Sequence, residues 1–588
     1  MIQKPIFMLC QHRMMTDVNW YDWLSVIWHG LPLDFSIAGY LTIIPAILIV
    51  VSVWIFHPLI RHFINGYSFI IILAVWLVII ADNGTFPYWG FRIDKTIFIY
   101  LTSPKEVLAS ANWWIWFFGV IVYILSVLLT WVIYKKTIGT IKFDDYNYLR
   151  EKFISCFVLL LLCATLFLPI RGSLSVSTMN TGRVYFSENR ILNLAAINPV
   201  FNLFESLSEQ TFDSSRYCYM SSNEAQQIIH QMIGENTDYS ADTLFTTSRP
   251  NIILIIWESM SANALFAMPA TQKLAESGIW FSNVYASSFR TDRGVVAILS
   301  GFPGQPTSSL MTAPSKTKSL HYISRDLQDA GYLLHWYYGG DEDFTNMRSY
   351  LLYGGFTDRV SDKSFPVGER LSKWGVQDNI LFNYCSNIIG RRELDENNHF
   401  DAILTLSSHE PFDVPVTNHF DDLYLNSLAF TDSCIGAFVD SLRMSPRWDK
   451  TLIVITGDHG YPYPYGIQNH DPQRYAIPLI LCGGAVRHNM KIEKICSQID
   501  WIPIVLNGIG LDADKYSFSK NILSDNTPDW AFYSYNDGWG LITDHDTVIY
   551  DRIAEKSVYN TDSSNNLEYN SKAFVQRIYE KIDSLSIK

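Results

Sequence analysis

The stretch TLIVITGDHG, residues 451–460, decides the fold. A run of strand-forming residues leads directly into Asp458 and His459, which glycines flank. Two other runs end in the same way: NIILIIW (251–257) precedes Glu258-Ser259, and DAILTL (401–406) precedes Ser407-Ser408-His409-Glu410. In open α/β sheets, ligands bind beyond the carboxyl ends of the strands. We therefore expect these polar clusters to meet in one site.

Short apolar runs alternate with helical patterns from Asn251 onward, and this predicts an α/β domain with a mostly parallel sheet covered by helices. The remaining runs of strand length are YLLHWYY (332–338) and AIPLIL (476–481). The end of the chain differs, because AFYSYN, GLITD and TVIYDRI predict a small antiparallel sheet before a final helix. We place the catalytic domain at 249–588.

Residues 1–171 have the composition of a membrane anchor. Four stretches are apolar over a length that can cross a bilayer as a helix, which takes ~20 residues; they lie at approximately 34–56, 67–84, 112–134 and 153–171. A soluble bundle of buried helices is the alternative, but such runs in series are rare in soluble cores. Residues 172–248 are predicted to form a helical connector with a polar boundary at 235–250.

Basic loops predict the orientation of the anchor, since loops rich in Lys and Arg stay in the cytoplasm. The connections after the third and first spans carry such residues: Lys135, Lys136, Lys142, Arg150, Lys152 and Arg61. The 85–111 connection mixes Arg92, Lys95 and Lys105 with acids and suits the outside. The chain after Pro169 is then extracytoplasmic. Residues 1–33 would lie outside without a signal peptide, so we expect either unaided crossing or the loss of an earlier span.

The charge and cysteine content exclude two classes of function. The net charge is −13 and no Lys/Arg cluster is present, so we expect no nucleic-acid partner. The acidic balance does not exclude an anionic substrate, because a bound cation would dominate the local field. The eight cysteines are scattered without CxxC pairs, and this predicts neither a disulfide framework nor a zinc finger.

Glu258, Asp458 and His459 make a mixed oxygen and nitrogen ligand set that suits Mn²⁺, Mg²⁺ or Zn²⁺. The alternative for each carboxylate is a helix cap. A further element, SSFRTDRGVVAILSGFP (287–303), places Thr291 in a polar turn before an apolar helix, where it could equally be an N-cap. A hydroxyl is a poor nucleophile unless a base or metal lowers its pKa. Arg290 and Arg293 flank it; one could hold a phosphate by paired hydrogen bonds, and the other could form a salt bridge.

The motifs NIILIIWES, SFRTDRG, SGFP, YYGGD, WGVQD, SSHEPF, GDHG and SQIDWIP occur in this order. Together they resemble the lipoteichoic-acid-synthase-like, or phosphoglycerol transferase, branch of the sulfatase/alkaline phosphatase superfamily, and the resemblance includes the multi-span anchor. It implies one divalent metal ion, most simply Mn²⁺, held by Glu258, Thr291, Asp458 and His459. It also implies a bacterial cytoplasmic membrane protein with an extracytoplasmic catalytic domain.

The same resemblance implies a reaction. Thr291 would attack a phospholipid such as phosphatidylglycerol, a phospho-threonine would form, and an envelope glycan, a lipid or water would take the head group. His409 matches the substrate-contacting histidine and could serve as general acid. Asp341 matches a pocket acid, and His470 is a further predicted contact.

The sequence departs from that family at the predicted substrate pocket. Members that polymerise glycerol phosphate carry Phe-Trp-Asn-Arg, whereas this chain has Phe344-Thr345-Asn346-Met347 with Arg348 one place later. Asn346 and Arg348 are kept as predicted contacts, but the head group is left open. Tyr338 or Gly339 replaces the pocket histidine, and four spans stand where the family usually has five.

Three other functions compete with this interpretation. A sulfatase needs Cys or Ser followed by Pro and Arg, which Thr291-Asp292-Arg293 does not supply. A phosphoethanolamine transferase generally has a disulfide-rich outer domain, which scattered cysteines do not favour. A non-catalytic channel or binding protein is disfavoured because the spans hold few ionisable residues and no predicted ligand is missing. Transfer and hydrolysis remain alternatives.

Overall fold

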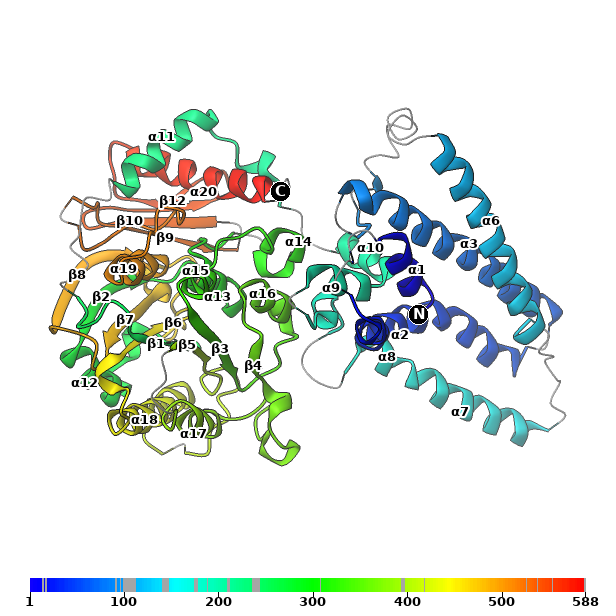
Figure 1. The fold of residues 1–588 in the computed structure, drawn as a ribbon, viewed down its shortest axis with the longest axis horizontal. Helices are drawn as coiled ribbons and strands as arrows, with labels where there is room; N and C mark the ends of the chain where they lie inside the picture. Colours follow the sequence, from blue (N-terminus) through cyan, green and yellow to red (C-terminus); the bar gives the residue numbers. More distant parts are fainter. Residues whose placement is uncertain are drawn as a thin grey trace. The chain divides into compact units, whose positions relative to one another are not determined.

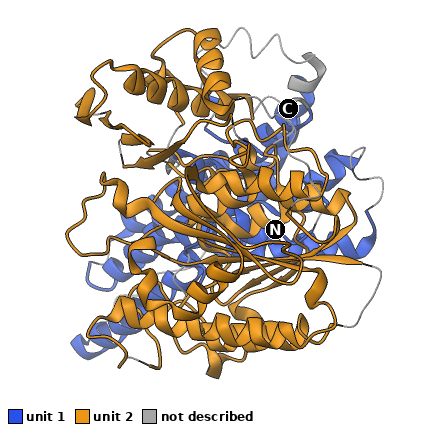
Figure 2. Cartoon of the chain, turned by 90° about the vertical axis from the view of Figure 1, so that its left-hand side faces the viewer, with its two compact units in different colours: residues 1–209 blue, residues 210–588 orange. Residues whose placement is uncertain are grey.

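A computed structural model describes residues 1–12, 15, 18–55, 57–89, 92–95, 97–98, 113–139, 148–173, 178–187, 189–208, 212–234, 244–306, 308–392, 397–416, 418–524, 526–536, 538–552 and 554–585. Lys105, Lys142 and most of the predicted boundary at 235–250 lie outside these residues. The chain forms two compact units, Met1–Glu209 and Gln210–Lys588 (Figure 2). The predicted connector is divided between them, because its first part belongs to unit 1 and the rest belongs to unit 2.

Unit 1 is helical. Its described helices are α1 (Gln3–Cys10), α2 (Trp20–Ser52), α3 (Pro58–Trp89), α6 (Trp113–Thr137), α7 (Leu149–Thr165), α8 (Phe167–Arg171), α9 (Arg190–Ala196) and α10 (Pro199–Ser208). Four segments are long and apolar enough to cross a membrane: Trp20–Ser52, Pro58–Pro87, Phe117–Thr137 and Leu149–Arg171. The prediction of four apolar N-terminal helices is therefore confirmed.

The first of these helices, Trp20–Ser52, begins before the predicted span at 34–56. Asn19 caps the helix by accepting from the backbone N–H groups of Tyr21 and Asp22. Asp34, which the prediction placed at the edge of a span, lies inside the helix and is buried. Its charge is compensated there by Lys4 at 2.6 Å and by the amide of Asn198 at 2.7 Å. Pairing of this kind makes a charged residue tolerable in an apolar helix.

The polar contacts of unit 1 differ between the connections predicted to be cytoplasmic and the connection predicted to lie outside. Arg61 donates a hydrogen bond to the Gly139 carbonyl at 2.8 Å, so the basic connections after α2 and α6 meet at one end. Arg92, from the connection predicted to lie outside, is buried and pairs with Asp82 at 3.0 Å. It also donates to the carbonyl of Leu194 in α9.

Unit 2 contains two sheets. The strands of the main sheet are β1 (Asn251–Trp257), β2 (Ile279–Tyr285), β3 (Tyr332–Tyr338), β4 (Asp358–Val360), β5 (Asn398–Leu404), β6 (Thr451–Gly457), β7 (Ala476–Cys482) and β8 (Met490–Ser497). They lie in the order β4-β3-β5-β1-β6-β7-β2-β8. All described neighbours are parallel except the two pairs that contain β7. The predicted mostly parallel sheet is confirmed.

Helices cover both faces of this sheet (Figure 1). The helices of unit 2 are α11 (Ser222–Ile233), α12 (Pro269–Ser277), α13 (Thr291–Ser300), α14 (Pro314–Thr317), α15 (Ile323–Asp329), α16 (Met347–Tyr353), α17 (Asp378–Ile388), α18 (Leu423–Arg443), α19 (Trp501–Gly508) and α20 (Asn566–Ser584). Alternate residues of β1 enter the two cores, since Leu254 packs with α13, α15 and α19 and Ile255 packs with α12, α17 and α18. Burial on both faces explains why β1 is apolar throughout.

The second sheet is antiparallel, as predicted, with the order β12-β11-β10-β9. Its strands are β9 (Trp530–Tyr535), β10 (Gly538–Thr543), β11 (Thr547–Asp551) and β12 (Lys556–Asn560). Helix α20 packs against β10 and β11, and α11 packs against α20. The final helix and the second part of the connector thus belong to one layer of unit 2 (Figure 1).

Candidate active site

The register of the central strands brings the predicted clusters together. In the pair β1–β6, Trp257 lies opposite Gly457, so Glu258 and Asp458 follow at the same level. Strand β5 lies on the other side of β1, and Thr405, just after it, accepts a hydrogen bond from the Glu258 backbone N–H at 2.9 Å. Parallel strands that end together place their next residues at one edge of the sheet, which is where ligands bind in such folds.

Glu258, Asp458 and His459 form a cluster whose ligand atoms all lie within 4.8 Å of one another. His459 Nε2 is 3.5 Å from Glu258 Oε1 and 3.5 Å from Asp458 Oδ2. The Nδ1–H of His459 donates to the Gly460 carbonyl at 3.1 Å, which leaves Nε2 as the nitrogen that can bind a metal. Asp458 Oδ1 accepts from the backbone N–H groups of Ser259 and His459 at 2.8 and 2.7 Å.

One atom of the cluster is left over. Asp458 Oδ2 is buried and has no hydrogen-bond partner among the described residues. An unpartnered buried carboxylate oxygen costs free energy, and a cation would remove that cost. Two carboxylates, one of them with an unpartnered oxygen, and an imidazole nitrogen therefore fit a divalent cation.

The pKa shifts of the three clustered side chains also indicate that the cluster lacks positive charge. Burial and the neighbouring charge of Glu258 raise the pKa of Asp458 well above its ordinary value. Burial opposes ionisation of Glu258 as well, but His459, His409 and hydrogen bonds from Ser259 and Thr291 hold the pKa of Glu258 below its ordinary value. Burial lowers the pKa of His459. These directions are those of two acids too close to ionise together without a cation.

Thr291 faces this cluster. Its Oγ1 donates a hydrogen bond to Glu258 Oε2 at 3.0 Å. It is the first residue of α13, with Arg290 in the N-cap position and no side-chain cap hydrogen bond. The N-cap alternative for Thr291 is therefore wrong. The hydroxyl lies at the amino end of a helix, where negative charge is favoured.

Three residues position these groups and were not among the predicted site residues. Gly294 in α13 packs on Asp458 so closely that a Cβ there would lie 2.1 Å from the Asp458 carbonyl oxygen. Gln498 Nε2 donates to the carbonyls of Gly457 and Asp458 at 2.8 and 2.7 Å. Ser259 adopts a positive φ of 56° and donates through Oγ to Glu258 Oε1. Gln498 lies in the motif SQIDWIP, and this motif was the sequence feature that could have identified it as a site residue.

His409 lies beside the cluster and electrostatically favours the ionised form of Glu258. Its Nδ1–H donates to the Glu410 carbonyl at 2.9 Å, so Nε2 is the nitrogen that can exchange a proton. The ring of Trp374 lies 4.1 Å from the His409 ring and 5.9 Å from Phe344. Trp374 comes from the motif WGVQD, but the sequence did not assign it to the pocket.

The predicted substrate contacts after β3 have other partners. Arg348 pairs with Glu342 at 2.8 Å and with Asp343 at 2.5 Å. Asn346 is buried and donates to the Thr312 carbonyl at 3.3 Å. Asp341 lies 3.6 Å from Lys363 Nζ.

The remaining predicted contacts differ in exposure. The Arg290 side chain is 55% exposed and 3.7 Å from Asp292. Arg293 is buried and donates to Ser288 Oγ at 3.2 Å. His470 is exposed, and its ring lies 6.3 Å from the ring of Tyr535.

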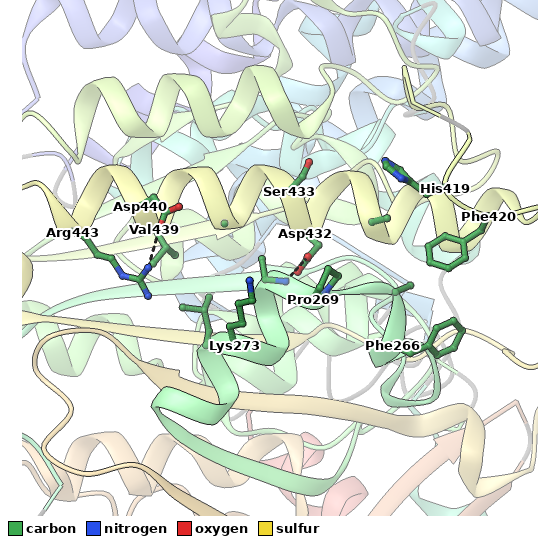
Figure 3. Close-up of a pocket in the computed structure, with 15 residues that line it drawn as sticks. Phe266, Pro269, Lys273, His419, Phe420, Asp432, Ser433, Val439, Asp440 and Arg443 are labelled. Atoms are coloured by element: carbon green, nitrogen blue, oxygen red, sulfur yellow. Dashed lines mark hydrogen bonds and ion pairs between the residues drawn. The ribbon is translucent and has the colours of Figure 1, made fainter.

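A cavity of about 640 Å³ lies elsewhere, between α12 and α18 (Figure 3). None of the predicted site residues lines it. Its buried acid, Asp432, accepts from the backbone N–H groups of Ala270 and Thr271 and from the Thr271 hydroxyl. Its Arg443 pairs with Asp440 at 2.8 Å. Asp432 thus serves helix capping, and Arg443 forms a surface ion pair.

Residues 250–511 match the family model described as Sulfatase. This part of the chain is a sulfatase-family domain. The chain is 24% identical to lipoteichoic acid synthase 2 of Bacillus subtilis (strain 168) over 38% of its own length and 36% of that relative. It therefore spans less than two thirds of that protein.

Two solved structures share the fold of the sulfatase-family domain. One is a protein in the alkaline phosphatase superfamily from Vibrio parahaemolyticus, at 20% identity and a TM-score of 0.56, covering 63% of this chain and 98% of that one. The other is the lipoteichoic acid synthase LtaP from Listeria monocytogenes, at 17% identity and a TM-score of 0.55, covering 63% and 99%. The resemblance to this superfamily is confirmed, and its members are enzymes that bind divalent metals. The sulfatase-family domain follows four helices suited to a membrane.

Proposed function

We propose that this protein is a membrane-bound, metal-dependent phosphotransferase that moves a phospholipid head group through a phospho-threonine at Thr291. The observation that carries the proposal is the Thr291 hydroxyl, which points at Glu258 beside Asp458 and His459. These four residues would hold one Mn²⁺, with Mg²⁺ or Zn²⁺ as alternatives. The bound cation would lower the pKa of the Thr291 hydroxyl and offset the charge of the phosphate.

The reaction consists of two displacements at phosphorus. In the first, a bond forms between Thr291 Oγ1 and phosphorus, and the bond to the diacylglycerol oxygen breaks. The proton that Thr291 now shares with Glu258 is lost to solvent, and His409 Nε2 gives a proton to the leaving oxygen. In the second, the oxygen of an acceptor hydroxyl or of water forms a bond to phosphorus, and the bond between phosphorus and Thr291 Oγ1 breaks. The proton of the acceptor goes to His409, and Thr291 Oγ1 regains a proton from solvent.

The substrate class is a phospholipid of the phosphatidylglycerol type, and the acceptor is an envelope glycan or lipid. Support comes from the relatives named as lipoteichoic acid synthases and from the four membrane-span candidates. The protein would lie in a bacterial cytoplasmic membrane with its catalytic domain outside. The basic connections that meet through Arg61 and Gly139 support a common cytoplasmic end.

The test uses the full chain in vesicles that contain Mn²⁺ and head-group-labelled phosphatidylglycerol or phosphatidylethanolamine. We expect release of diacylglycerol and label on the protein at Thr291, located by mass spectrometry. Thr291→Ala should lose the label and lower turnover more than ~10³-fold, as the loss of a nucleophile does. The exposed Thr246 offers a matched control, since Thr246→Ala should behave as the parent.

Two results would contradict the proposal. If Thr291→Ala turns over as fast as the parent, Thr291 is not the nucleophile. If neither lipid reacts, the substrate class is wrong. Label that goes to water although an acceptor glycolipid is present would indicate hydrolysis in place of transfer.

A further inference from the structure

None of the arginines that the sequence predicted as substrate contacts has a guanidinium that is free to bind the phosphate on two sides. Three arginines were predicted to contact the substrate, and of these Arg348 is held by Glu342 and Asp343. Arg293 is buried and already donates from Nη1 to Ser288 at 3.2 Å, although its Nε also lacks a partner among the described residues. Arg290 is mostly exposed beside Asp292. A phosphate held by an arginine needs a guanidinium that is free to present two N–H groups.

Arg474 has such a guanidinium. It forms no hydrogen bond and no ion pair with any described residue, and its Nε is buried without a partner. Its guanidinium carbon lies 5.5 Å from the centroid of the Phe289 ring. Burial lowers the pKa of Arg474, which reflects a cation that is partly removed from water and poorly compensated.

The backbone that carries Arg474 is fixed. Arg474 belongs to a 3₁₀ turn, Pro472–Tyr475, which Asp471 caps by accepting from the Gln473 N–H. The next residue, Tyr475, is fully buried and stacks on Tyr533 with ring centroids 4.1 Å apart. Its carbonyl accepts from the Ala286 N–H at 2.7 Å. The position of Arg474 is therefore set by the core.

This position is next to the reacting groups. A Cβ on Gly460, which directly follows His459, would lie 2.1 Å from the Arg474 carbonyl oxygen. Phe289, under the guanidinium, stands two residues before Thr291. Arg474 thus lies between the strand end that carries His459 and the turn that carries Thr291.

We propose that Arg474 binds a non-reacting, negatively charged oxygen of the phosphate group that Thr291 receives. This rests on the proposed function and assigns to Arg474 the role that the sequence suggested for Arg290 or Arg293. The ligand class is a phosphoryl group with two unesterified oxygens, which matches the planar fork of a guanidinium. No bond to Arg474 forms or breaks. Phe289 keeps the fork in place by packing under it.

Binding of inorganic phosphate to the full chain with Mn²⁺ tests the proposal directly. We expect Arg474→Gln to raise the Kd for phosphate about 10–100-fold, as the loss of a charge-assisted hydrogen bond does. Arg474→Lys should show a smaller loss, because it keeps the charge but not the fork. Arg216→Gln is the control, since Arg216 is exposed and its ion pair among the described residues is with Asp213.

The turnover of labelled phosphatidylglycerol gives a second measurement, in which kcat/KM should fall by the same factor for Arg474→Gln. Unchanged phosphate affinity in both Arg474 variants would overturn the proposal. If Arg474→Gln melts at a lower temperature, its loss of affinity could come from unfolding, and Arg474→Lys then separates the two roles. A purely structural role predicts that Arg474→Lys binds phosphate with the parent's affinity, whereas a binding role predicts a weaker affinity. An inactive Thr291→Ala together with a fully active Arg474→Gln would reject this inference alone, whereas a fully active Thr291→Ala would reject the proposed function.

Discussion

The two sides of the candidate site are built in opposite ways. On the metal side, Glu258, Asp458 and His459 follow strands that end in register, and one carboxylate oxygen is left unpartnered. On the substrate side, the segment 341–348 leaves β3 as a turn whose charges are used within the protein. Arg348 there contacts two acids, Glu342 and Asp343, and Arg359 pairs with Glu342 at 3.0 Å.

This difference distinguishes charged groups that are available to bind a ligand from charged groups that stabilise the fold. A buried charge without a partner is costly, so its persistence indicates a ligand. A charge that is paired on several sides is a structural element, and its presence near a site is weak evidence for binding. The charged residues of the metal side are expected to control binding and turnover, and those of the substrate side are expected to control stability.

The strongest test of this contrast is Asp458→Asn. The variant keeps the size of the side chain and an oxygen that can accept from the Ser259 and His459 N–H groups. It removes the charge, so we expect Mn²⁺ affinity to fall by at least about 100-fold, since even outer-shell changes cost 10–100-fold. Titration calorimetry with Mn²⁺ measures this effect.

The control is Glu493→Gln, at an exposed acid that pairs with Lys491. It should bind Mn²⁺ as the parent does. If Asp458→Asn also binds Mn²⁺ with the parent's affinity, the cluster is not the metal site, and the contrast between the two sides is lost.

On the substrate side, Arg348→Gln is expected to act on stability. It leaves Glu342 and Asp343 with fewer partners, and we expect the free energy of unfolding of unit 2 to fall by about 3 kcal/mol. Tryptophan fluorescence in a urea titration of the full chain measures the change. Arg443→Gln, at an exposed pair with Asp440, should cost less than about 1 kcal/mol.

The ion pair between Arg348 and Asp343 should also make the free energy of unfolding depend on pH. Burial opposes the charge of Asp343, but Arg348 and Lys363 hold its pKa below the ordinary value. The resulting stability is present above the unfolded pKa of about 3.9 and is lost as pH falls through the lower folded pKa. The parent should therefore lose more stability than Arg348→Gln on acidification below about pH 4. Equal losses would show that Arg348 does not stabilise the carboxylate.

The metal side could be predicted from sequence because periodicity and strand ends determine it. Glu258 directly follows one apolar run, the pair Asp458-His459 follows another, and parallel pairing brings such positions to one edge. Thr291 was ambiguous between nucleophile and cap, and its hydrogen bond to Glu258 spans 33 positions that no local pattern describes.

The substrate side and the start of α2 could not be predicted, because the deciding contacts are not local. The partners of Arg348 lie in its own acidic turn, whereas Arg474 reaches the site through a turn anchored on the small sheet. The helix extends back to Trp20 through Asp34, whose charge is compensated by Lys4, by the Met1 amino group and by Asn198, the last of these 164 positions away. Sequence patterns report burial and period but not which distant charge compensates another.

The smallest expected effect concerns strain on the substrate side. Thr345 has a φ of 51° and Asn346 a φ of 65°, so two residues in succession adopt the left-handed region. For a β-branched residue such as Thr345 this conformation is unfavourable, and glycine adopts it freely. We expect Thr345→Gly to raise the free energy of unfolding by about 1 kcal/mol, measured by the same urea titration.

Thr312→Gly is the matched control, because Thr312 lies in a 3₁₀ helix and glycine there should lower stability. If both glycine variants lower stability alike, the contact of Thr345 with Met311 at 3.6 Å outweighs the strain. A variant that is more stable but turns over phosphatidylglycerol more slowly would show that the strained turn positions Phe344 against Trp374. The substrate side would then contribute to catalysis through backbone geometry, while its charges serve stability.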